Sequence, residues 1–107
     1  MKIEVIKFGG SSVADANKIK HVANIIKEKA NNNVKVVVVV SAMGGSTDKL
    51  IALANEVSQE PNPRELDVLL STGEIVTSTL LSMQLNTISI QSISLTGIQA
   101  GIRTDDA

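Results

Sequence analysis

Two glycine-rich segments of the sequence combine the residue types that bind phosphate groups. KFGGSSV, residues 7–13, places a lysine, a glycine pair and two serines directly after an apolar run. SAMGGSTD, residues 41–48, repeats the glycine pair and the hydroxyl groups after a second apolar run. Glycines expose their backbone N–H groups to a ligand, and a helix that starts beside them adds the positive end of its dipole. The two segments together predict a binding site for a phosphate chain.

The charge of Lys7 indicates where this site lies. Lys7 has the same strand parity as Ile3 and Val5, so it takes the last position of a face that is expected to be buried. A buried ammonium group without a partner is unfavourable, and a bound anion would remove that cost. The alternative is a solvated lysine before an ordinary tight turn, and helix capping alone would explain Ser41 and Thr47. Neither segment matches the Walker A or GxGxxG motif, so the interpretation rests on the arrangement of the two loops.

A carboxylate stands in a third segment, STGE at residues 71–74. Glu74 follows Gly73, which is expected to end one helix, so it would stand at the start of the next. There it could stabilise the helix N-terminus, or it could bind the ammonium group of a substrate. The chain has no cysteine and one histidine, His21, which is interpreted as a surface residue, and no metal ligands are predicted.

The hydrophobic pattern predicts the elements that position these segments. Residues 2–8 and 34–41 are predicted to be strands with two apolar faces. A third strand is expected over residues 92–95, closed by Thr96 and Gly97; either it begins near Ile90 or a bend precedes it. Apolar residues at helical spacing predict four helices, at about residues 15–30, 46–57, 64–73 and 74–85. This order is typical of an α/β fold with a parallel sheet, in which ligands bind beyond the carboxyl ends of the strands. Both glycine pairs lie at such ends.

Composition narrows the classes of function. The chain has 107 residues, of which 43% are hydrophobic and 20% charged, the balance of a soluble globular domain. A net charge of −1 gives no general attraction to nucleic acids or anionic membranes, and a single aromatic residue, Phe8, argues against a platform for stacking bases. We expect neither a signal peptide nor a membrane span, and therefore a cytoplasmic protein.

Four motifs in this order and spacing are similar to a known family: KFGGSSV, VVVSAMGGSTDKL, ELDVLLSTGE and SLTGIQAGIRTD. They resemble the N-terminal part of the aspartokinases, which belong to the amino acid kinase family. The resemblance implies a three-layer αβα sandwich with a mainly parallel sheet. It also implies that residues 1–107 are the N-terminal portion of the catalytic domain, and that the nucleotide-binding C-terminal half and the ACT regulatory domains are absent.

The activity implied by the resemblance is transfer of the γ-phosphoryl group of ATP, bound with Mg²⁺, to the β-carboxylate of L-aspartate. This is the first step towards lysine, threonine and methionine, and a homo-oligomer is expected for the full-length form. Two alternatives stay open. The chain could come from another carboxylate kinase of the family, such as one acting on acetylglutamate, or it could be a non-catalytic fragment that folds or binds a partner.

The resemblance also assigns positions to the site. They are Lys7, Phe8, Gly9, Gly10 and Ser41 for the phosphates of ATP, and Thr47 and Glu74 for aspartate. We expect Lys7 to be the catalytic residue, because its charge would stabilise the phosphoryl group during transfer. The sequence departs from the family pattern at Ser11, where threonine is commoner, and at Ser89, where a glycine often ends the helix.

Overall fold

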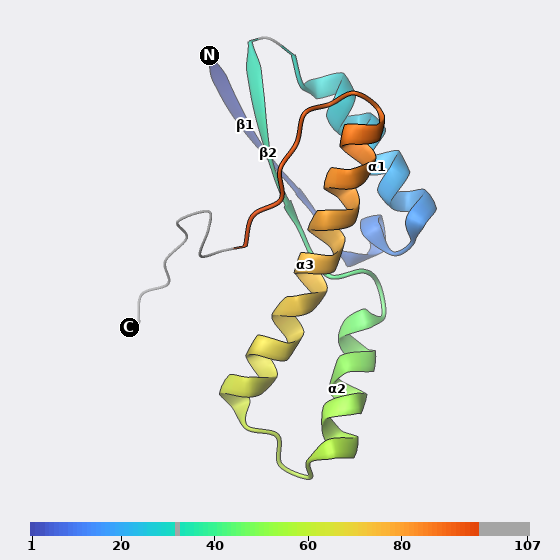
Figure 1. The fold of residues 1–107 in the computed structure, drawn as a ribbon, viewed down its shortest axis with the longest axis vertical. Coiled ribbons are helices and arrows are strands. Elements are labelled where there is room, and N and C mark those ends of the chain that lie inside the picture. The colour runs from blue at the N-terminus through green and yellow to red at the C-terminus, as the bar shows by residue number, and fades with distance from the viewer. Residues whose placement is uncertain (32, 97–107) are drawn as a thin grey trace.

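The computed structural model describes residues 1–31 and 33–96, which form a two-stranded parallel sheet and three α-helices (Figure 1). In chain order the elements are β1 (Lys2–Phe8), the short 3-10 helix η1 (Gly10–Val13), α1 (Ala16–Lys29), β2 (Val34–Val40), α2 (Ser46–Val57) and α3 (Pro63–Thr87). Gly97 and most of the SLTGIQAGIRTD motif lie outside the described residues.

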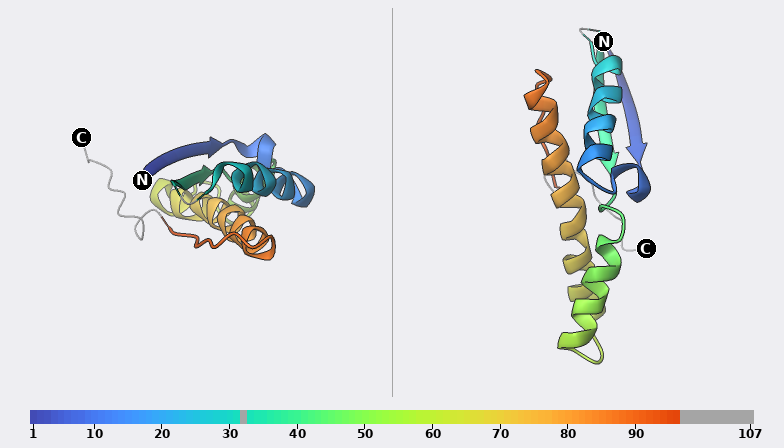
Figure 2. Two further views of the ribbon diagram at one scale, coloured as in Figure 1. Left: turned by 90° about the horizontal axis from the view of Figure 1, so that it is seen from above. Right: turned by 90° about the vertical axis from the view of Figure 1, so that its right-hand side faces the viewer.

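The two strands pair in parallel, with Lys2 opposite Val34 and Phe8 opposite Val40. Their pairing across α1 confirms the predicted α/β class. The helices lie on one side of the sheet only, as Figure 2 shows from two further directions. On the other side Ile3 is 65% exposed and Val39 is 44% exposed. Within the described residues, helices therefore cover one face of the sheet and leave the other face open.

The core lies between the covered face of the sheet and two helices. Its buried side chains are Val13, four residues of α1 (Ile19, Val22, Ala23 and Ile26) and two residues of α3 (Leu81 and Leu85). Phe8 and alternate valines of β2 pack against this cluster from the sheet. The predicted amphipathic helix is confirmed in α1, where Asp15 caps the first turn by accepting a hydrogen bond from the backbone N–H of Lys18 at 2.9 Å.

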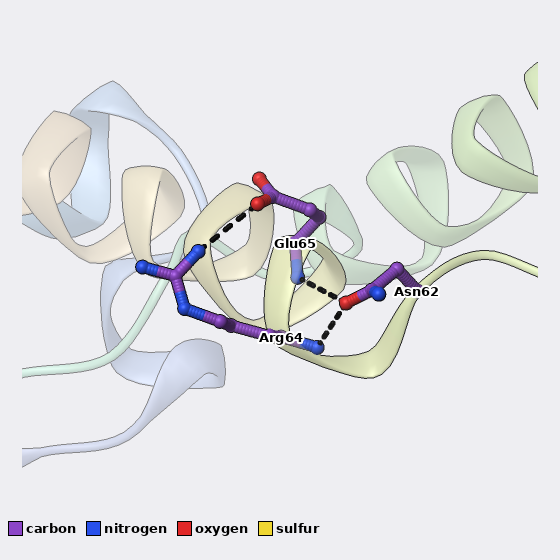
Figure 3. A network of polar contacts seen from close by, with 3 residues as sticks. All are labelled: Asn62, Arg64 and Glu65. Carbon is purple, nitrogen blue, oxygen red and sulfur yellow. Dashed lines mark hydrogen bonds and ion pairs between the residues drawn. The ribbon is translucent and has the colours of Figure 1, made fainter.

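The helix α3 begins at a well-formed N-terminal cap (Figure 3). The side-chain oxygen of Asn62 accepts hydrogen bonds from the backbone N–H groups of Arg64 at 2.9 Å and Glu65 at 3.2 Å. Pro63 fits the first turn because its missing N–H group is not needed there. From this cap α3 runs without interruption to Thr87, so the predicted break at Gly73 and second start at Glu74 are wrong.

The C-terminus of α3 has the two hydrogen bonds of a Schellman motif. The backbone N–H of Ile90 donates to the carbonyl of Leu85 at 2.8 Å, and that of Ser89 donates to Asn86 at 3.2 Å. Ser89 occupies the left-handed position of this motif with φ 69°. The departure from glycine at this position therefore leaves the turn in place, with a serine in a conformation that glycine adopts more easily.

The third strand predicted for residues 90–95 does not form. No described strand pairs with this segment, and its polar groups bond to α3 instead. The backbone N–H of Ser92 donates to the side-chain oxygen of Asn86 at 3.0 Å, and the hydroxyl groups of Ser82 and Ser92 lie 3.0 Å apart. The alternation of apolar and polar residues in this segment is therefore not sufficient for a strand. A strand would need a neighbouring strand to pair with, and the described residues do not supply one.

The helix α2 and the first half of α3 form a hairpin that extends beyond the carboxyl ends of the strands (Figure 1). No residue of α2 is buried, so α3 is the main support of this helix. By length and composition alone α3 could also cross a membrane, a test that core helices of soluble proteins pass as well. In this structure α3 packs against α1, α2 and β2.

We expect Ser89→Gly to stabilise the protein by about 0.5–1 kcal/mol. A non-glycine residue in the left-handed region costs about 1–2 kcal/mol, which the substitution removes. The greater flexibility of glycine in the unfolded chain offsets about 0.5–1 kcal/mol of this stabilisation. Urea unfolding followed by circular dichroism measures the change. Ser58→Gly is the matched control. Ser58 is the residue directly after α2, and its φ of −141° is an extended conformation without the strain of Ser89. Equal effects of the two substitutions would contradict the strain at Ser89.

Candidate functional site

A cleft of about 550 Å³ lies where the loop after β2 meets the first half of α3. It is lined by Gly10, Ser41, Ala42, Met43, Gly44, Gly45, Thr47, Asp67, Leu70, Ser71 and Glu74. This cleft lies beyond the carboxyl ends of the strands, where the sequence predicts a site. Four predicted site residues, from three separate segments of the chain, line this cleft, and they are Gly10, Ser41, Thr47 and Glu74.

Lys7 is not among the residues that line the cleft. It is exposed at the end of β1, on the sheet face where Ile3 and Val5 are each 65% exposed. The argument that Lys7 ends a buried face is therefore wrong, because the helices cover the opposite face. The assignment of Lys7 to phosphate binding stays a prediction, and it rests on a solvent-accessible charge beside Gly9 and Gly10.

Phe8 and Gly9 also lie outside the cleft, and they differ in what surrounds them. The side chain of Phe8 packs against the core, and its carbonyl accepts a hydrogen bond from the backbone N–H of Ser41 at 3.2 Å. This bond joins the two glycine-rich loops at their bases. No atom lies within 4 Å of the position that a Cβ on Gly9 would take. The backbone at Gly9 is therefore open to a ligand, whereas Phe8 is a packing residue.

The helix that adds its positive end to the site is α2, and the prediction that α1 does so is wrong. The glycine pair of the first loop leads into the four-residue η1, and α1 begins only at Ala16 behind its own cap. In contrast, α2 begins at Ser46 directly after Gly45, which has φ 82° and no side chain to cap the helix. Its first turn has no side-chain cap, and Gly45 and Thr47 line the cleft. The partial positive charge of α2 is thus available to an anion there.

The hydroxyl groups of the second loop do not cap α2. Ser46 donates its hydroxyl hydrogen to the carbonyl of Met43 at 2.7 Å and so closes the turn before the helix. The hydroxyl groups of Ser41 and Thr47 have no hydrogen-bond partner within residues 1–31 and 33–96. The capping interpretation of Ser41 and Thr47 is therefore wrong in the described structure, and both hydroxyl groups are free for a ligand.

The opposite wall of the cleft is one face of α3. Asp67, Ser71 and Glu74 follow each other at helical spacing, so their side chains lie along a single line. Because α3 is continuous, Glu74 stands in the middle of a helix and cannot stabilise a helix N-terminus. Asp67 and Ser71 were not predicted as site residues, because the expected helix break at Gly73 separated them from Glu74. A continuous helix would have shown the i, i+4, i+7 spacing of these residues.

Gly73 lets α3 approach the second loop closely enough to form the cleft. A Cβ at Gly73 would lie 2.7 Å from the Cβ of Ala42, a distance that side chains do not tolerate. Gly73 is buried, and one turn later the buried Thr77 donates its hydroxyl hydrogen to the Gly73 carbonyl at 3.1 Å. The close packing of α3 against the loop thus explains why residue 73 is a glycine. From the sequence alone this glycine was expected to end a helix.

The described residues contain no group of three or more His, Cys, Asp or Glu side chains that could hold a metal ion. The carboxylates of the cleft are Asp67 and Glu74, and no basic side chain lines it. Neither carboxylate makes a hydrogen bond or an ion pair within the part of the chain that the structure describes. The cleft therefore offers carboxylates on one wall and the uncapped end of α2 on the other.

Comparisons with known proteins agree with one another. The model of the amino acid kinase family matches residues 2–107. The chain is 51% identical to the aspartokinase of Geobacillus stearothermophilus and 53% identical to aspartokinase 2 of Bacillus subtilis (strain 168), over 99% and 98% of its length. Among solved structures it is similar to the aspartate kinase from Synechocystis, with a TM-score of 0.83 and 49% identity over 87% of this chain.

The chain spans about a quarter of the length of the curated relatives that it matches. It covers 26% of each of the two aspartokinases and 16% of the Synechocystis chain.

We expect Gly73→Ala to lower the free energy of unfolding by about 1–2 kcal/mol. Overpacking costs about 1–3 kcal/mol, and the better helix propensity of alanine offsets up to about 1 kcal/mol of that. Urea unfolding of the variant measures the loss. Combining the change with Ala42→Gly removes the opposing Cβ and should recover part of the stability.

Gly9→Ala is the matched control for this prediction, because Gly9 has φ −78° and open space around it. It should change the free energy of unfolding by less than about 0.5 kcal/mol, as exposed substitutions usually do. A Gly73→Ala variant that is as stable as the parent would show that α3 does not depend on this close approach.

Proposed function

Because the chain belongs to the amino acid kinase family, we propose that it forms the aspartate-binding and phosphate-binding part of an aspartokinase. The whole protein would transfer the γ-phosphoryl group of ATP to the β-carboxylate of L-aspartate. The observation that carries the proposal is the shared cleft of Ser41, Thr47 and Glu74 in a chain about 50% identical to aspartokinases. Ser41 and Thr47 come from the second motif of the resemblance, and Glu74 comes from the third.

The proposed division of the site follows the distribution of charge. Aspartate would lie in the cleft, with its ammonium group at Glu74 and with Thr47 as a hydroxyl donor or acceptor. The phosphates of ATP would lie at the edge formed by Lys7, Gly9 and Gly10, where the cation of Lys7 and the open backbone of Gly9 are available. Gly10 and Ser41 line the cleft next to this edge, so they would stand between the two substrates.

The proposed reaction needs positioning and charge stabilisation more than proton transfer. An oxygen of the β-carboxylate attacks the γ-phosphorus, and the bond to the oxygen that bridges the β- and γ-phosphorus atoms breaks. ADP leaves with that bonding electron pair, and 4-phospho-L-aspartate forms. The β-carboxylate is already ionised at neutral pH, so no general base is required. In this proposal Lys7 stabilises the charge of the transferring group, and Glu74 and Thr47 hold the acceptor.

The residues present fit a phosphate-bound Mg²⁺ better than a metal held by protein alone. The described residues lack a cluster of three ligating side chains. Mg²⁺ in phosphoryl-transfer sites is commonly bound through substrate phosphates and one or two carboxylates, and it neutralises phosphate charge. Asp67 and Glu74 are the carboxylates that line the cleft. The proposal assigns Glu74 to aspartate and leaves the coordination of the ion mainly to ATP.

The remaining features of the proposed enzyme follow from the same identification. We place it in the cytoplasm, as a homo-oligomer in its full-length form, at the first step towards lysine, threonine and methionine. Nucleic acids and membranes are not among its proposed partners. A kinase for another carboxylate of the family, such as acetylglutamate, is the alternative. The free carboxylate of Glu74 in the cleft favours a substrate with an unacylated amino group.

Aspartate-dependent release of ADP tests the proposed function directly. A full-length protein that carries these residues is incubated with Mg²⁺ and ATP and with aspartate, glutamate or acetylglutamate in turn. We expect release with aspartate and at most a small fraction of that rate with the other two. A protein that releases ADP only with acetylglutamate would overturn the proposal in favour of the alternative.

We expect Lys7→Ala to lower kcat by at least about 100-fold in such a full-length protein. Loss of one preorganised group that stabilises developing charge has effects of this size. Steady-state kinetics measure the change, with circular dichroism as a check on folding. Lys35→Ala is the control, since Lys35 is an exposed lysine at the other end of the same sheet face. Near-normal kcat in Lys7→Ala would make Lys7 an ordinary surface lysine.

We expect Glu74→Gln to raise KM for aspartate by about 10- to 100-fold, the range for a hydrogen bond to a charged group. KM for ATP and the melting temperature should change little, because Glu74 is exposed and makes no bond within the described residues. Glu56→Gln on the exposed side of α2 serves as the control for charge removal. A Glu74→Gln variant that melts earlier with unchanged aspartate kinetics would assign Glu74 a structural role.

A further inference from the structure

The wall of the cleft on α3 offers hydrogen-bond acceptors only. The hydroxyl hydrogen of Ser71 is donated to the carbonyl of Val68 at 2.7 Å, so the oxygen of Ser71 can only accept from a ligand. Asp67 and Glu74 stand on either side of it along the helix, and ionised carboxylates accept only. A ligand group that binds to this wall must therefore be a donor of hydrogen bonds.

The opposite wall has the reverse character. The first turn of α2 has no side-chain cap, and backbone N–H groups at a helix start are donors with a partial positive charge. The N–H of Ser46 is already donated to the carbonyl of Met43 at 3.0 Å, and the acidic residue of this turn, Asp48, does not line the cleft. Thr47 adds a hydroxyl group without a partner among the described residues. A zwitterion placed between the two walls has one favourable orientation, with its ammonium group towards α3 and its carboxylates towards α2.

The spacing along α3 places Ser71 at the centre of the acceptor wall. Asp67 and Glu74 are separated by about 10.5 Å along the helix axis at 1.5 Å per residue, too far for both to contact one ammonium group closely. Ser71 is one turn from each of them, and side chains three or four positions apart are neighbours on a helix surface. An ammonium group bonded to Glu74 can thus donate a second hydrogen to Ser71, while Asp67 lies further away.

We propose that Ser71 accepts a hydrogen bond from the substrate ammonium group, and that Asp67 orients the substrate by repelling its carboxylates from the α3 wall. This inference rests on the proposed function and extends it to two residues. Ser71 contacts the substrate and sets specificity for an amino group, whereas Asp67 acts at a distance as a positioning residue. The charge of the cleft agrees with this role, because its charged lining side chains are the two carboxylates on α3.

The test compares aspartate as substrate with succinate as competitive inhibitor in the full-length protein. Succinate has the two carboxylates of aspartate without the ammonium group. Ser71→Ala should raise KM for aspartate by about 10-fold, the lower end of the range for a hydrogen bond to a charged group, and leave kcat and the inhibition constant of succinate within about twofold. Ser71→Thr keeps the hydroxyl group and should restore KM. Ser78→Ala is the matched control, because Ser78 donates to Ile75 in the same way outside the cleft.

Asp67→Asn should lower the inhibition constant of succinate by about two- to fivefold, the scale for one exposed charge, and the effect should shrink as salt is raised. Glu56→Gln on α2 should leave it unchanged. Two results would overturn the role of Ser71. One is an equal KM for aspartate in Ser71→Ala and Ser78→Ala. The other is a change in the inhibition constant of succinate in Ser71→Ala that equals the change in KM for aspartate. If succinate inhibits the Asp67→Asn variant no more strongly than it inhibits the parent, the role of Asp67 is overturned. If the parent shows no aspartate-dependent turnover, the proposed function fails and this inference with it.

Discussion

The structure depends on how closely α3 approaches the loop that follows β2. Gly73 makes this approach possible, since any side chain there would meet Ala42. The contact fixes α3 in the middle of its length, and from this point one half of the helix reaches the core while the other half forms the hairpin with α2. The same contact brings Glu74, the next residue along, to the edge of the cleft. Packing and site geometry therefore share one constraint.

The one-sided sheet separates two environments at the carboxyl ends of its strands. On the covered side, Phe8 and the alternate valines of β2 are packed against α1 and α3. On the open side, Ile3, Val5 and Lys7 are exposed, so the lysine and the open backbone of Gly9 face solvent. The cleft lies beyond the strand ends between the second loop and α3. A phosphate-binding edge and an amino-acid-binding cleft can thus adjoin each other without sharing their charged side chains.

Local patterns were sufficient to predict β1, β2 and α1, because their apolar residues recur at the period of each element and Asp15 marks the start of α1. They were not sufficient where distant residues decide the conformation. Gly73 resembles a helix end until Ala42 is known to oppose it, and residues 90–95 resemble a strand that has no neighbour among the described residues. Lys7 was predicted to be buried for the same reason. Its position in the strand shows that it shares a face with Ile3 and Val5, but only the packing of distant helices decides which face is covered.

The candidate site shows the same division between local and distant information. Glycines and hydroxyl groups after β2 could be recognised as ligand-binding types, and Thr47 and Glu74 were identified through the resemblance to a family. Asp67 and Ser71 required the continuous helix, because their relation to Glu74 is a matter of helical spacing. Predicting which wall donates and which accepts would also have required the hydrogen bonds of the folded chain. The hydroxyl hydrogen of Ser71 is used within α3, and the start of α2 has no side-chain cap. In our proposal such a cleft would orient a zwitterion, because each wall would repel the charge that the other wall attracts.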